Sequence, residues 1–123
     1  MTLILDVVIL GKPPGINEMY INIRGRGRAL TSDARKWKEN IGKIVKLRAE
    51  EDYKKYATAD LYLEIMWFWP NTYYKRDIDG PIKLVMDAVC KALGYNDSRV
   101  VELHVTKLKD GDERFAILLT TVP

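Results

Sequence analysis

The sequence contains one cysteine, one histidine and no long hydrophobic run. The single Cys90 excludes an internal disulfide and fits a reducing cytoplasm. No apolar segment approaches the roughly 18–20 residues that a membrane-spanning helix needs, and residues 1–6 lack the basic start of a signal peptide. The lone His104 gives no basis for a Ser/His or Cys/His nucleophilic pair, and we expect it on the surface of a strand. These features predict a cytoplasmic protein with no membrane partner.

The length of 123 residues predicts one domain over the whole chain. A hydrophobic share of 47% and a charged share of 30% are typical of an ordinary globular protein. The net charge of +3 does not by itself predict binding to nucleic acid, but the charges are unevenly distributed. Arg24, Arg26 and Arg28 place three guanidinium groups within five residues, whereas the segment from Asp77 to Asp97 concentrates carboxylates. A nuclease needs both a basic surface for the DNA backbone and an acidic pocket for metal.

Alternating and β-branched apolar residues predict four strands, at residues 3–10, 60–69, 99–108 and 114–122. Residues 60–69 are apolar on both faces, which predicts a strand that is central or covered on both sides. The segment Lys109-Asp110-Gly111-Asp112 is expected to form the turn of a hairpin that joins the last two strands. Residues 15–31 are expected to be irregular or to form a loose hairpin with the Arg-Gly repeat at its tip.

Two helices are predicted between these strands. The first covers about residues 32–49, after a cap at Thr31 or Ser32. The second opens at Gly80-Pro81, with Gly80 as the cap, and ends at Gly94. The order β-α-β-α-β-β predicts an α+β domain with a mixed sheet covered by two helices.

Acidic residues occur before, within and after the second predicted helix, at Asp77, Asp79, Asp87 and Asp97. Clustered carboxylates repel one another unless a cation offsets their charge, and Mg²⁺ is the usual cation of all-oxygen sites that act on phosphates. Asp79, Lys83 and Asp87 fall on one side of the helix, where Lys83 could neutralise an attacking or leaving oxygen. A simpler alternative is that Asp79 is a helix-start charge, Lys83 and Asp87 form a surface ion pair, and Asp97 forms a turn.

The pattern Asp77-x-Asp79-x-x-x-Lys83-x-x-x-Asp87, followed by Asp97, resembles the RusA family of Holliday junction resolvases, and the resemblance runs over most of the chain. Members of this family are small dimeric endonucleases that use magnesium. The resemblance implies that Asp77, Asp79 and Asp97 are catalytic carboxylates that bind Mg²⁺ and that Lys83 is the essential lysine. Asp87 also matches the family pattern.

Outside the acidic segment, the Pro13-Pro14 turn with Asn17 resembles the family's N-terminal motif, and Arg26 falls in a basic loop similar to the family's. Two positions differ from the family pattern. Gly80 stands where the family usually has asparagine, and Asn96 stands where it often has an acidic residue. The arginine-rich segment could be a solvated loop, but beside a nuclease site we expect it to contact DNA. The expected DNA-binding residues are Arg24, Arg26, Arg28, Lys12, Asn17, Lys75 and Arg76.

The residues and the resemblance together predict a magnesium-dependent endonuclease that resolves four-way (Holliday) DNA junctions without an organic cofactor. Paired symmetric incisions require two sites, so a C2 homodimer is expected. Two alternatives stay open: a DNA-structure-binding protein without cleavage activity, and a nuclease for flaps or single strands.

The length of the second helix raises a problem for a metal site within one subunit. About 13 helical residues at 1.5 Å each separate the two ends by roughly 20 Å, whereas the four residues from Gly94 to Asp97 reach at most about 14 Å. Antiparallel packing of two such helices across a two-fold axis would place Asp97 beside Asp77 and Asp79 of the partner subunit. The sequence therefore favours a composite site, although a bent or shortened helix could also close the gap.

Overall fold

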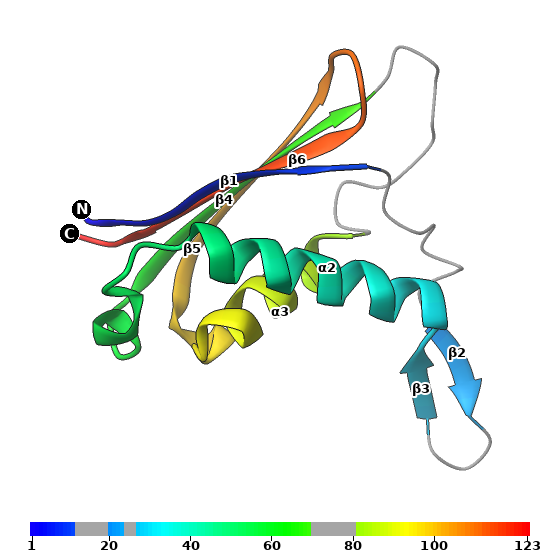
Figure 1. Cartoon of the computed structure of the whole chain (residues 1–123), viewed down its shortest axis with the longest axis horizontal. Coiled ribbons are helices and arrows are strands. Elements are labelled where there is room, and N and C mark those ends of the chain that lie inside the picture. Colours follow the sequence, from blue (N-terminus) through cyan, green and yellow to red (C-terminus); the bar gives the residue numbers. More distant parts are fainter. Residues whose placement is uncertain (12–19, 24–26, 70–80) are drawn as a thin grey trace.

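Figure 1 shows the computed structural model of the chain, which describes residues 1–11, 20–23, 27–69 and 81–123. A four-stranded sheet is formed by β1 (Leu3–Leu10), β4 (Leu61–Trp69), β5 (Val100–Lys109) and β6 (Arg114–Thr121). Helices α2 (Ser32–Arg48) and α3 (Ile82–Leu93) lie together on one side of this sheet. The shorter elements are a hairpin of β2 (Tyr20–Ile23) and β3 (Gly27–Leu30) and the 3₁₀ helices η1 (Tyr53–Tyr56) and η2 (Asp97–Arg99). This architecture confirms the predicted α+β class.

The strand order β1-β6-β4-β5 places β4 inside the sheet, antiparallel to β6 and parallel to β5. The expected hairpin between β5 and β6 is therefore wrong, because β4 lies between them. The chain after Lys109 passes over the end of β4, where the Asp110 N–H donates to the Trp69 carbonyl at 2.7 Å. A helical crossover can join two parallel neighbours, and α3 does so here, leaving the other edge of β4 for β6. Alternation within a strand does not reveal which neighbour that strand pairs with.

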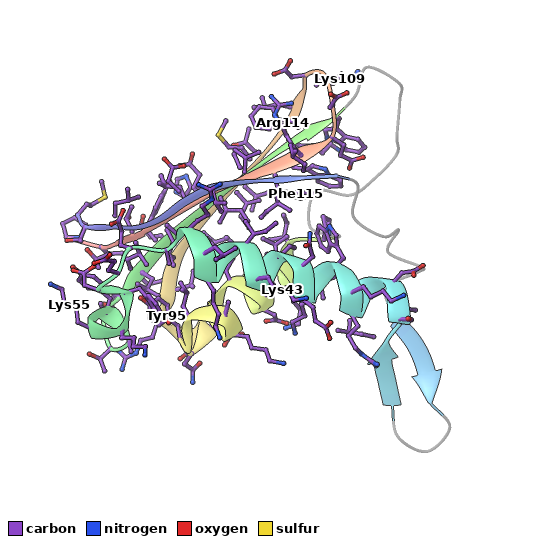
Figure 2. All side chains as sticks on the ribbon, viewed as in Figure 1. Lys43, Lys55, Tyr95, Lys109, Arg114 and Phe115 are labelled. Carbon is purple, nitrogen blue, oxygen red and sulfur yellow. The ribbon has the colours of Figure 1, made fainter. Side chains whose placement is uncertain are left out.

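The hydrophobic core lies between the sheet and the two helices. Leu63, Ile65 and Trp67 of β4 are fully buried. Trp67 stacks on Phe115 of β6 with 5.3 Å between ring centroids. Phe115 points from the sheet toward α2 (Figure 2), where the Trp37 ring meets it edge-on at 5.6 Å. The face of β4 that carries Leu63, Ile65 and Trp67 therefore packs against both helices.

The opposite face of β4 is only half-buried. It carries Tyr62, Glu64, Met66 and Phe68. No helix in the described ranges covers this face, so the predicted covering by two helices applies to one face of the sheet (Figure 1).

The helix ends follow from local capping. The Thr31 side-chain oxygen accepts a hydrogen bond from the Ala34 N–H at 3.3 Å, and α2 begins at the next residue, as expected. Helix α3 begins at Ile82 with Pro81 as its cap, one residue later than expected, and Gly80 lies outside the described residues. Gly94 adopts φ 72° and ends α3, as predicted. Neither helix, nor any other in the described part of the chain, is long and apolar enough to cross a membrane.

Candidate functional site

Helix α3 carries Lys83 in its first turn and Asp87 one turn later. Lys83 is exposed and Asp87 is half-buried, whereas Val85 and Val89 of the same helix are fully buried in the core. The two side chains were expected, in the simpler alternative, to form an ion pair. No ion pair joins Lys83 to Asp87 in the described structure, so that part of the alternative is not supported.

The turn after α3 is fixed by backbone and side-chain hydrogen bonds. The Tyr95 N–H donates to the Cys90 carbonyl at 2.8 Å and the Gly94 N–H donates to the Lys91 carbonyl at 3.3 Å, the Schellman arrangement of a helix end. The hydroxyl of the buried Tyr95, which is labelled in Figure 2, donates to the Tyr53 carbonyl in η1. Burial raises the pKa of Tyr95 to about 12, so this hydroxyl keeps its proton near neutral pH. Tyr95 is therefore held in place, and Asn96 and Asp97 follow directly from this anchored residue.

Asp97 is the first residue of η2 and is exposed. The Asn96 side chain caps η2 by accepting a hydrogen bond from the Ser98 N–H at 3.0 Å. Asp97 and Asp87 line the same hollow, whose volume is about 390 Å³. The other residues around the hollow are Lys38, Cys90, Lys91, Tyr95 and Asn96. The fold thus brings Asp97 together with Asp87 and two lysines.

Cys90 lines this hollow and is buried, with an exposed fraction of 3%. Its burial, followed by the charges of Asp97 and Asp87, raises the pKa of its thiol to about 11. A protonated thiol is a weak nucleophile, which agrees with the expectation that Cys90 is a packed residue. The effect of both carboxylates on one thiol agrees with their position around the same hollow.

The residues at the hollow offer oxygen donors of the kind that Mg²⁺ prefers. Asp97 and Asp87 contribute carboxylates and Asn96 contributes an amide. Among the residues that the structure describes, no group of three or more His, Cys, Asp or Glu could hold a metal ion. A metal at Asp97 would therefore need further ligands. Asp77 and Asp79, which were expected to supply them, lie outside the described residues.

Helix α3 separates the two ends of the expected site. Its 12 residues span about 18 Å at 1.5 Å per residue. Lys83 lies near the beginning of this span and Asp97 lies beyond its end. The helix is therefore close to the expected length. Asp79, the other end of the gap that favoured a composite site, lies outside the described residues.

One of the three clustered arginines lies within the described residues. Arg28 lies in β3, where it pairs with Asn22 of β2, and only its backbone is described. The hairpin projects from the beginning of α2, away from the sheet (Figure 1). The other expected DNA-binding residues lie outside the described ranges; they are Lys12, Asn17, Arg24, Arg26, Lys75 and Arg76.

Lys38 and Lys91 are the residues at the hollow that sequence reasoning missed. Lys91 follows Asp87 by four residues, so helical spacing alone could have identified it. Lys38 comes from α2, and no local pattern connects it to Asp97.

An α+β fold with carboxylates and lysines around one hollow suits an enzyme that acts on nucleic-acid phosphates, and one comparison with known families assigns the chain to that class. The model of the family described as endodeoxyribonuclease RusA matches residues 11–120 of the 123-residue chain. The chain therefore belongs to the RusA endodeoxyribonuclease family. A comparison with curated proteins finds no match.

Proposed function

We propose that this protein is a magnesium-dependent endodeoxyribonuclease that resolves four-way DNA junctions by paired symmetric incisions. The observation that carries the proposal is the hollow beside the second half of α3, where Asp87 and Asp97 lie near Lys38 and Lys91. Its occurrence in a chain of the RusA family supports a nuclease site. Carboxylates can hold a metal in such a site while the lysines attract phosphate.

Asp77, Asp79 and Asp97 would hold the metal ion. A bound Mg²⁺ supplies a Lewis acid and lowers the pKa of coordinated water. Asp97 is exposed on η2, so it is accessible to an ion that arrives with its hydration shell. The anchored turn of Gly94 and Tyr95 limits the positions that the Asp97 carboxylate can take.

Lys83 would stabilise the negative charge that develops at the reacting phosphate oxygens. It is exposed in the first turn of α3, where the helix dipole also favours an anion. Lys38 and Lys91 would attract phosphates toward the Asp97 hollow, and the arginines of the β2–β3 hairpin would contact the DNA outside it.

Two symmetric incisions in one junction need two active sites. The functional unit would therefore be a C2 homodimer, in which the same surfaces of both subunits face a junction of matching symmetry.

A cleavage assay on DNA of defined shape tests this function. Labelled four-way junction, flap, single strand and linear duplex of shared sequence would each be incubated with Mg²⁺ or with a chelator. We expect paired nicks in the junction, with Mg²⁺ only, at a higher rate than in any other substrate. Tight binding of the junction without nicks would favour the non-cleaving alternative, and faster cleavage of flaps or single strands would favour the other nuclease.

A further inference from the structure

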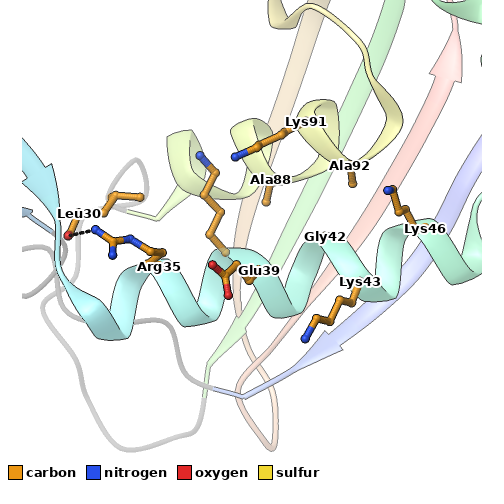
Figure 3. Close-up of a pocket in the computed structure, with 10 residues that line it drawn as sticks. Leu30, Arg35, Glu39, Gly42, Lys43, Lys46, Ala88, Lys91 and Ala92 are labelled. Carbon is orange, nitrogen blue, oxygen red and sulfur yellow. Dashed lines mark hydrogen bonds between the residues drawn. The ribbon is translucent and has the colours of Figure 1, made fainter.

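Helices α2 and α3 form the walls of a surface groove of about 500 Å³ (Figure 3). The helices approach closely because the residues between them are small. A Cβ atom added to Gly42 of α2 would lie 3.8 Å from the Ala92 Cβ of α3, and Ala88 lines the groove one turn earlier. The walls carry mostly basic side chains, which are Arg35, Lys38, Lys43, Lys46 and Lys91, with Glu39 among them.

The charge of the groove comes mainly from α2. This helix has six basic and two acidic side chains, a net charge of +4, which exceeds the +3 of the whole chain. The Arg35 guanidinium donates to the Leu30 carbonyl at 3.4 Å, which orients it without neutralising it. None of the groove lysines forms an ion pair with another described residue. Like charges repel one another along the groove, so an anion bound there lowers the electrostatic free energy.

The cations form a line, which suits an extended anion. Arg35, Lys38 and Lys46 recur at helical spacing along one side of α2. From Arg35 to Lys46 the helix rises by about 16 Å, which corresponds to roughly five phosphates at 3.4 Å per phosphate along one DNA strand. A free phosphate ion would meet only one or two of these cations at a time. The groove therefore matches a phosphate backbone better than it matches a small anion.

The groove is continuous with the hollow that contains Asp97. Lys38 and Lys91, one from each helix, line both of them. A backbone lying along the groove would therefore pass between these two lysines and reach Asp97 and Asp87.

We propose that the α2–α3 groove binds the sugar-phosphate backbone of the DNA strand that enters the Asp97 hollow. This inference rests on the proposed function, because it assigns the groove to the same DNA substrate. Arg35, Lys43 and Lys46 contact phosphates away from the cut, and Lys38 and Lys91 contact those nearest to it.

The test compares two double variants of α2. Lys43→Gln/Lys46→Gln removes two groove cations, and Lys36→Gln/Arg48→Gln removes two exposed cations of the same helix that do not line the groove. Each pair includes one cation from the last turn of α2, so the loss of helix stability is matched. Junction affinity would be measured by fluorescence anisotropy between about 50 and 200 mM salt, with a chelator present to prevent cleavage.

We expect the groove pair to lower the slope of log affinity against log salt by about 1.8, since each lost phosphate contact removes about 0.9. Affinity near 0.1 M salt should fall roughly tenfold or more, while the control pair stays close to wild type. Thermal melts followed by circular dichroism would establish that both variants are folded.

The possible results distinguish a failure of the groove proposal from a failure of the proposed nuclease function. If the wild-type protein cuts junctions but the two double variants show equal slopes of log affinity against log salt, the groove proposal is wrong and the nuclease proposal stands. A wild-type protein that binds but never cuts overturns the proposed function, and a groove-specific loss of slope would still support the groove. A wild-type protein that binds no DNA overturns both.

Discussion

The hydroxyl of Tyr95 donates a hydrogen bond to the backbone carbonyl of Tyr53, and this contact ties the turn after α3 to η1. Asp97 follows Tyr95 by two residues and begins η2. A hydrogen bond between a side chain and the backbone therefore helps to position a candidate metal ligand.

Replacing Tyr95 by phenylalanine should lower the free energy of unfolding by about 1 kcal/mol, because the Tyr53 carbonyl loses its donor. Cleavage should fall more than junction binding, since the Asp97 turn becomes less restrained. Tyr56→Phe is the matched control, because the Tyr56 hydroxyl donates at 3.3 Å to the exposed Asp52 carboxylate. Urea denaturation and single-turnover cleavage measure the two effects. A Tyr95→Phe protein as stable and as active as Tyr56→Phe would contradict this role.

Stability should decline at alkaline pH because of two buried groups. Burial is the largest cause that raises the pKa of Cys90 from 9.0 to about 11 and that of Tyr95 from 10.0 to about 12. Above about pH 9 the unfolded chain loses these protons before the folded chain does, so the free energy of unfolding falls as pH rises. The contribution is complete below that pH and is lost by about pH 12.

Urea denaturation at several values between about pH 8 and pH 11 measures this decline. Cys90→Ala should remove the part that begins near pH 9 and leave the later part, which belongs to Tyr95. A decline of the same size and onset in Cys90→Ala would show that another group is responsible.

Much of the fold could be predicted because it depends on local signals. Thr31 and the apolar face of α2 predicted that helix to within a residue, and the alternation of residues 60–69 predicted β4. The β5–β6 hairpin was wrong because pairing is decided by the α3 crossover, which no turn motif encodes. Pro81 became the cap of α3, so its beginning moved by one residue.

The site was predicted less completely, since its parts come from different elements. The family pattern suggested roles for Asp97 and Lys83, which stay predictions, but it did not indicate that Asp87 shares a hollow with Asp97. Lys38 and Lys91 are distant in sequence and line the same hollow because α2 and α3 pack closely, with Gly42 opposite Ala92. The roles expected of Asp77 and Asp79 stay predictions.

Mixing two inactive variants tests whether each site is shared between subunits. Asp79→Asn and Asp97→Asn chains with different affinity tags would be combined and the heterodimer isolated. If Asp97 of one subunit completes the site of the other, one site collects both substitutions and the other is wild type. We expect this heterodimer to nick one strand of the junction, which denaturing gels would reveal.

The two parent homodimers are the controls and should produce no nick. A heterodimer that binds the junction but leaves every strand intact would show that each site belongs to one chain, and the nuclease assignment would be unaffected. In that case Asp87, which lies along α3 between Lys83 and Asp97, would become the next carboxylate to test.

The most direct measurement is the single-turnover cleavage of a four-way junction after Mg²⁺ is added to preformed complexes. Wild type, Asp79→Asn, Asp97→Asn and the surface control Asp112→Asn would be compared at equal occupancy. We expect wild type and Asp112→Asn to make paired symmetric nicks that a chelator abolishes. Asp79→Asn and Asp97→Asn should bind at least as tightly, because negative charge facing the phosphates is reduced, yet lose cleavage. Cleavage by Asp97→Asn at the wild-type rate, or by wild type without a divalent ion, would contradict a metal-dependent nuclease site at Asp97.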